Sequence, residues 1–277
     1  DKNFRSRIAG INATQFAAQE MFRYPYLGVM SDLESIANKL DLAFYYFVQE
    51  PLIKGVLGRN DGDVNEYYKF VRENNKFEEL GLVGLALWRM MDLFLTLDFP
   101  SSPIYRVIDY GVSGQKPQNP YAPGKFSLAT EGYLSSNGPL YGLQLYYHLT
   151  NINTLPSFAS IEAWASPLPS KQGIYPLGFT LNLERLPIYS TESYSFGVSG
   201  NIGLSFQQRP EWETSESNVN YGFYPEGGAK VSIAGKSWEL FAGMQYRGPN
   251  TIWNESANNS GFKLVLGGTW FLSPKPH

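Results

Sequence analysis

The sequence predicts an α+β fold in which a helical first part is followed by an antiparallel sheet of about eight strands, with a range of eight to ten. Three observations support this division. Charged residues make up roughly a quarter of the chain up to residue 123 but only about one in eight from 124 to 273. The last aspartate is Asp109, and aspartate is strongly depleted from strands. Apolar residues recur at helical spacing before this point and at alternate positions after it.

The boundary between the two parts is predicted at Ser113–Gly124, which contains three prolines and three side-chain amides. Such a composition is typical of a linker, because proline interrupts both helices and sheets. We therefore expect a helical domain over residues 1–112, a linker over 113–124 and a sheet domain over 125–273.

Three helices are predicted in the first part. Ser31–Glu34 has the S-x-x-E pattern of a capping box and precedes a long apolar run. Asp63–Glu66 offers a looser cap for a short second helix. A third helix is expected over about 78–97, where Arg89 and Asp92 are three positions apart and can pair on its surface.

The second part shows the period-two alternation of strands, separated by turn-forming residues. A weak alternation at 104–112 offers a further strand, which is why the expected count extends to ten. The connection at 150–157 is not shorter than its neighbours, which complicates an assignment of short and long loops to opposite ends. The expected strands are 125–134, 140–149, 158–165, 174–184, 192–206, 228–234, 237–247 and 261–272.

The polar face of these strands carries mostly Ser, Gly, Asn, Thr and Gln, whereas a face in water normally carries many Lys, Glu and Asp. Strands of about ten residues match the tilted span of a bilayer. We therefore expect the apolar face to meet lipid, as in a transmembrane β-barrel. A lipocalin-like barrel or a sandwich with an apolar interior is the alternative. Aromatic residues lie near strand ends on the apolar face, as in interfacial girdles: Tyr141, Tyr194, Phe206, Trp238, Tyr246 and Trp270.

The stretch GFKLVLGGTWFL, Gly261–Leu272, alternates apolar residues and ends on aromatics, like the closing strand of a membrane barrel. Over about 124–273 the chain resembles bacterial outer-membrane β-barrel proteins. This resemblance implies a bacterial outer-membrane location, membrane lipids around the barrel and a helical domain facing the periplasm. The residues SPKPH that follow depart from members of this class that end at the final aromatic. The resemblance is to an architecture and specifies no reaction.

An eight-stranded barrel is just wide enough to be filled by its own side chains. Charged groups inside it need partners, so we expect a plug in which carboxylates pair with cations. The polar network expected in the lumen consists of Glu131, Gln144, His148, Glu162, Asn182, Glu184, Glu239, Gln245, Arg247 and Lys263.

His148 is the candidate for catalysis, as the base of a lipid-modifying hydrolase or acyltransferase. No serine lies two positions away and no G-x-S-x-G motif is present. Asn60–Glu66 has acidic residues at alternate positions, but Glu66 stands where a calcium loop needs glycine. With no cysteine in the chain, we expect no metal site and no cofactor.

The sequence thus favours a non-enzymatic outer-membrane protein, in which a small plugged barrel anchors a helical domain that binds protein partners in a cell-envelope assembly. A net charge of −3 argues against nucleic acid as a partner. A lipid-modifying enzyme using His148 and an outer-membrane transport channel remain the alternatives. The sequence leaves the oligomeric state open.

Overall fold

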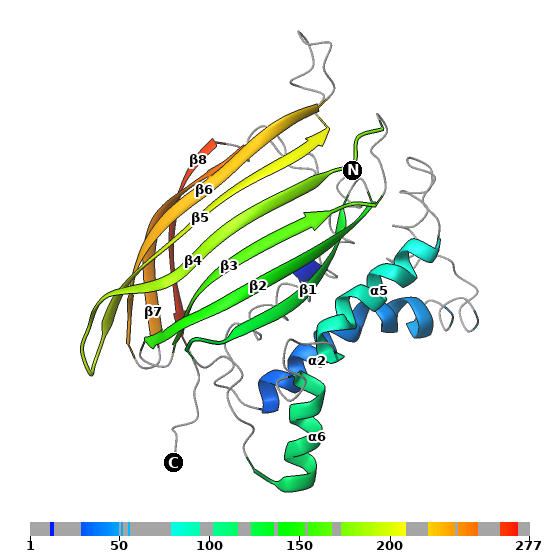
Figure 1. The fold of residues 1–277 in the computed structure, drawn as a ribbon, viewed down its shortest axis with the longest axis horizontal. Helices are drawn as coiled ribbons and strands as arrows, with labels where there is room; N and C mark the ends of the chain where they lie inside the picture. Colours follow the sequence, from blue (N-terminus) through cyan, green and yellow to red (C-terminus); the bar gives the residue numbers. More distant parts are fainter. Residues whose placement is uncertain are drawn as a thin grey trace.

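The computed structural model describes residues 12–13, 29–49, 51, 55, 79–94, 102–115, 123–135, 138–152, 155–167, 173–208, 221–235, 238–248 and 261–270. Within these ranges the chain forms three α-helices followed by one antiparallel sheet of eight strands (Figure 1). The α+β class and the strand number are therefore confirmed. The predicted helix at Asp63–Glu66 and the segment Asn60–Glu66 lie outside the described residues.

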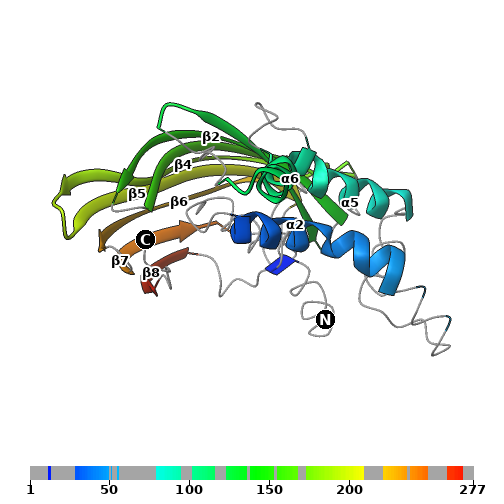
Figure 2. The same ribbon diagram turned by 90° about the horizontal axis from the view of Figure 1, so that it is seen from below.

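The sheet is a simple meander in which each strand pairs with the next along the chain. Among the described residues β1 and β8 are not hydrogen-bonded to each other, so the sheet is open. Figure 2 shows that it curls strongly, with β7 and β8 beneath β2 and β4. The strands are β1 Phe126–Ser135, β2 Gly138–Ile152, β3 Leu155–Ala165, β4 Leu177–Ser190, β5 Ser195–Gln208, β6 Tyr221–Ala234, β7 Trp238–Arg247 and β8 Gly261–Trp270.

Connection length differs between the two ends of the sheet. At one end only residues 153–154, 191–194 and 235–237 join successive strands, and β1 begins and β8 ends there. At the other end the connections are 136–137, 166–176, 209–220 and 248–260. The expectation of a long connection at 150–157 was wrong, because β2 and β3 pair as far as Ile152 and Leu155.

The helices are α2, Val29–Phe44, which continues as the π-helix η2, Tyr45–Gln49, then α5, Glu79–Phe94, and α6, Pro103–Ser113. α2 begins two residues before Ser31, so the predicted capping box does not mark its start. None of the described helices combines the length and the apolar character needed to cross a membrane.

The predicted extra strand at 104–112 was wrong, because this segment is α6. The Ser102 hydroxyl accepts a hydrogen bond from the Tyr105 amide and so caps the first turn. Pro103 occupies a first-turn position, where its missing N–H costs nothing. Gly114 has φ 67° and ends the helix in the left-handed conformation. These local signals outweigh a weak period-two pattern.

α5 packs on the outer side of β1 and β2 because β1 offers it a position without a side chain. A Cβ at Gly132 would lie 2.5 Å from Arg89 Cγ and 2.9 Å from Leu85 Cδ1. The Trp88 indole donates a hydrogen bond to the Gly142 carbonyl at 2.8 Å. Arg89 is fully buried and pairs with Asp41 of α2 at 3.0 Å, so the expected surface position for Arg89 was wrong.

The unpaired edge of β1 is covered by side chains from the helical part. The Asn12 amide donates to the Leu134 carbonyl and accepts from the Leu134 N–H, both at 2.9 Å, as a neighbouring strand would do. Lys39 of α2 donates to the Thr130 carbonyl at 3.1 Å and is 2% exposed. Covering an edge in this way protects it from pairing with another chain.

Candidate functional site

The sheet has two chemically different faces, which we call the polar face and the apolar face. Residues paired across antiparallel strands share a face, and each strand alternates between the two. The registers therefore place all ten residues expected in the lumen on the polar face: Glu131, Gln144, His148, Glu162, Asn182, Glu184, Glu239, Gln245, Arg247 and Lys263.

The polar face is the concave one. Arg185 on β4 donates to the Glu239 carboxylate on β7 through two nitrogens, at 3.0 and 2.8 Å. Three strand spacings along a flat sheet amount to about 14 Å. The two side chains can therefore meet only because the sheet curls around them, and both are almost completely buried.

Further contacts bridge strands that are not neighbours in the sheet. Glu184 on β4 accepts from Lys230 on β6 at 2.8 Å and also lies 3.5 Å from Arg185. Thr180 donates to Glu226 at 3.3 Å, and Glu226 lies 3.6 Å from Arg247. The ion pairs place a cation beside each of Glu184 and Glu226, as carboxylates removed from water require.

Alternation could not reveal Arg185, which has φ 54° at an irregularity between Leu183 and Leu186. This irregularity shifts the register by a residue and turns the Arg185 side chain to the polar face, beside that of Glu184. The sequence signal was the break of alternation in NLERLP. Lys230, Glu226 and Ser127 were missed as well, since nothing local distinguishes them from other polar-face positions.

His148 lies in a buried cluster on β1, β2 and β3. Its Nε2 is 2.8 Å from the Ser127 hydroxyl on β1, and both residues are at most 9% exposed. The rings of Tyr146 and Phe158 flank the imidazole. The register places His148 on the same face of the sheet as Gln144, and Ser127 supplies its hydrogen-bond partner.

Two amides and a tyrosine extend this cluster. The Tyr146 hydroxyl donates to the Gln144 carbonyl oxygen, and the Gln144 amide donates to Ser160 at 3.0 Å. Asn182 donates to the same hydroxyl at 3.4 Å. Glu131 is buried two residues from Tyr133, which donates to it at 3.3 Å. The polar face near β1 thus carries three hydrogen-bonded groups, Ser127 with His148, Gln144 with Tyr146, Ser160 and Asn182, and Tyr133 with Glu131.

The apolar face is the exposed one. Leu264 and Leu266 on β8 are 80% and 79% exposed, and Ile202 on β5 is 65% exposed. Large apolar side chains continue across the face on every strand from β4 to β8, among them Leu177, Phe179, Leu181, Leu204, Phe223, Val231, Leu240, Met244, Phe262 and Trp270. A patch of this extent is unusual on a water-soluble monomer.

Within the described part of the chain, no group of three or more His, Asp or Glu side chains is arranged to hold a metal ion. No protein-family model, curated protein or solved structure matches the chain. The function must therefore be argued from the two faces of the sheet and from the clusters on the polar face.

Proposed function

We propose that the chain is a non-enzymatic protein of the bacterial outer membrane, whose eight strands sit in the bilayer with the apolar face toward lipid. The observation that carries this proposal is the inverted burial of the sheet. Its large apolar side chains are exposed, while its carboxylates, guanidinium groups and amides are turned inward, where Arg185 pairs with Glu239 and Gln144 bonds to Ser160. In water this arrangement would expose the large apolar side chains to solvent, which is unfavourable, whereas lipid would cover them.

The connections support the same proposal. Outer-membrane barrels have short turns at the periplasmic end and longer loops outside. Here the end with connections 153–154, 191–194 and 235–237 would be periplasmic, and the end with 166–176, 209–220 and 248–260 would be outside. The expected periplasmic position of the helices stays a prediction. α5 contacts Tyr141 and Gly142, close to the end with the longer connections.

The helical part supports a role in assembly. It is bonded to β1 through Asn12 and Lys39 and to β2 through Trp88, so the sheet anchors it. α6 turns Ile108 and Val112 outward, at 59% and 84% exposed. We propose that this face of α6 contacts a protein partner in the envelope. A photo-crosslinking residue at 112 should then form a discrete adduct that one at 109 does not form.

The membrane proposal is tested by placing a charge on the apolar face. Leu264→Arg should destabilise the protein in bilayers by about 2–4 kcal/mol, because an arginine near the bilayer midplane is costly on the lipid face of a barrel. Phe44→Arg on α2 is the matched control, since Phe44 is also exposed but is not on the sheet. Equal and negligible effects of the two substitutions, with the protein remaining in the aqueous phase without detergent, would refute the membrane proposal.

Conductance separates a plugged sheet from a channel. The ion pairs that cross the concave side predict no steady conductance when the protein is reconstituted in planar bilayers. A stable open state in the wild-type protein would favour the transport alternative.

A second candidate function rests on the contact between Ser127 and His148. A serine hydroxyl 2.8 Å from an imidazole nitrogen has the geometry in which the imidazole can take the hydroxyl proton as oxygen attacks an acyl carbonyl. Release of the alcohol and hydrolysis of the acyl-serine would complete a lipid hydrolase cycle. Labelling by a fluorophosphonate probe that disappears in Ser127→Ala and His148→Ala would support this activity. Absence of labelling in the wild type would eliminate it.

A further inference from the structure

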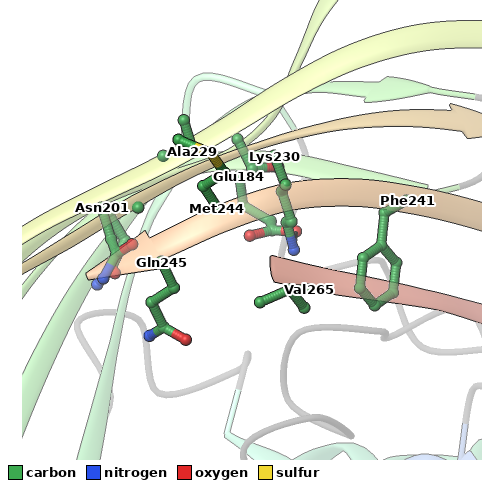
Figure 3. A pocket seen from close by; sticks show the side chains of 13 residues that line it. Glu184, Asn201, Ala229, Lys230, Phe241, Met244, Gln245 and Val265 are labelled. Carbon is green, nitrogen blue, oxygen red and sulfur yellow. Dashed lines mark hydrogen bonds and ion pairs between the residues drawn. The ribbon is translucent and has the colours of Figure 1, made fainter. Parts of the chain in front are cut away.

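The middle of the polar face contains a pocket of about 450 Å³, formed by β4 to β8 (Figure 3). This volume lies within the range of about 300–1,000 Å³ that is usual for small-molecule sites. The side chains of Asn201, Gln245, Lys230 and Phe241 project from the same side of the strands into the space beneath the sheet.

Three amide side chains form one row across the pocket. The registers pair Asn182 with Asn201, Asn201 with Gly228, and Gly228 with Gln245. Asn201 and Gln245 are two strand spacings apart, about 10 Å at the backbone. In the described part of the chain neither of these two side chains makes a hydrogen bond, so their donors and acceptors are available to a ligand. Each amide can both donate and accept.

Glycines create the space between the amides. A Cβ at Gly228 would lie 3.1 Å from Asn201 Oδ1 and 2.9 Å from the Met244 carbonyl. Gly243, in the next row, would place a Cβ 2.4 Å from the Ala229 carbonyl. The floor of the pocket is therefore bare backbone, and a flat molecule can approach it closely.

The charges in the pocket are already matched. Glu184 pairs with Lys230 at 2.8 Å, and Lys230 also lies 5.4 Å from the centre of the Phe241 ring. Among the residues that line the pocket, a strongly charged ligand would therefore find no uncompensated opposite charge. The walls combine neutral amides with apolar surface from Phe241 and Val265.

From these observations we propose that the pocket binds one unit of a neutral sugar, with hydroxyl groups bonded to Asn201 and Gln245 and an apolar ring face against the glycine floor. A sugar ring offers hydroxyls that donate and accept, together with C–H surface, and carries no charge. The proposal does not depend on the membrane location or on the helical part, because it rests on the polar face alone.

The test uses the full chain in detergent and measures saturation-transfer NMR and calorimetry with glucose, N-acetylglucosamine and maltose. At least one of these sugars should bind at millimolar concentration, and Asn201→Ala and Gln245→Ala should each weaken its binding about tenfold. Gln208→Ala removes an amide from the last residue of β5, which does not line the pocket, and serves as the control that leaves binding unchanged. Circular dichroism verifies that each variant is folded.

The relative affinities of the three sugars distinguish two sources of the ligand, a glycan chain and a free sugar. Tighter binding of the disaccharide than of either monosaccharide would indicate one unit of a glycan chain, and tighter binding of a monosaccharide would indicate a free sugar. The proposal is overturned if none of the three sugars binds, if folded Asn201→Ala and Gln245→Ala bind as well as the wild type, or if glucuronate or glucosamine binds better than the neutral sugars.

Discussion

Substitutions in the buried ion pair between Arg185 and Glu239 should lower the free energy of unfolding more than other substitutions in the curled sheet. Removing one member of such a pair leaves an uncompensated charge in a low-dielectric environment, at a cost of about 3–5 kcal/mol. The two members are not equivalent here. Glu239 is 2% exposed in the wild type, and Arg185 is the one cation within ion-pair distance of it in the described structure, so removing Arg185 leaves this carboxylate without a cation. Without Glu239, Arg185 keeps Glu184 at 3.5 Å.

We therefore expect Arg185→Ala to lower the free energy of unfolding by about 3–5 kcal/mol, and Glu239→Ala to lower it by about 1–2 kcal/mol less. The double variant should cost less than the sum of the two single changes, because it leaves no buried charge unmatched. Arg185→Gly provides an internal control. The backbone at this position has φ 54°, so glycine should be about 1 kcal/mol more stable than alanine there.

The assay is denaturant unfolding of the protein reconstituted in lipid vesicles, followed by tryptophan fluorescence. If Glu239→Ala is at least as costly as Arg185→Ala, the remaining contact with Glu184 has no stabilising role and the reasoning is wrong. Strict additivity of the two single changes would show that the side chains are not coupled and that the curl does not depend on their contact.

Three further results are expected from the helical part. Asn12→Ala should accelerate hydrogen exchange of the Leu134 amide by about tenfold or more, because it removes both hydrogen bonds that Asn12 makes to Leu134. Unchanged exchange would show that the edge of β1 is protected in another way. Gly132→Val should displace α5 and alter Trp88 fluorescence, while Gly111→Ala, with nothing within 4 Å of its Cβ, should leave Trp88 unaffected. Burial raises the pKa of Asp32 from 3.8 to about 6, although the Arg106 guanidinium opposes this rise. The native state then binds the proton more tightly than the unfolded state, so this contribution to stability is fully present below about pH 4 and is lost as the pH rises through about 6. This contribution to the free energy of unfolding amounts to about 3 kcal/mol. Asp32→Asn should remove the pH dependence of stability that hydrogen exchange measures between pH 4 and 7.

The sequence by itself determined the division into a helical part and a sheet, the eight strands, and the separation of polar from apolar side chains. These features are local, because the period of an element and the face of each residue follow from a few neighbouring positions. The ten residues expected to face the interior all lie on one face for this reason. The helix at Pro103–Ser113 also had local signals, Ser102 before it and Gly114 after it, and a weak alternation obscured them.

Tertiary structure alone decided which of these groups meet. Ser127 reaches His148 through the register of β1 against β2, and Arg185 reaches Glu239 because an irregular residue and the curl of the sheet bring β4 and β7 together. The covering of the β1 edge by Asn12 and Lys39 joins positions that are about a hundred residues apart. Such contacts depend on register, curvature and packing between distant segments, which a repeating local pattern does not encode.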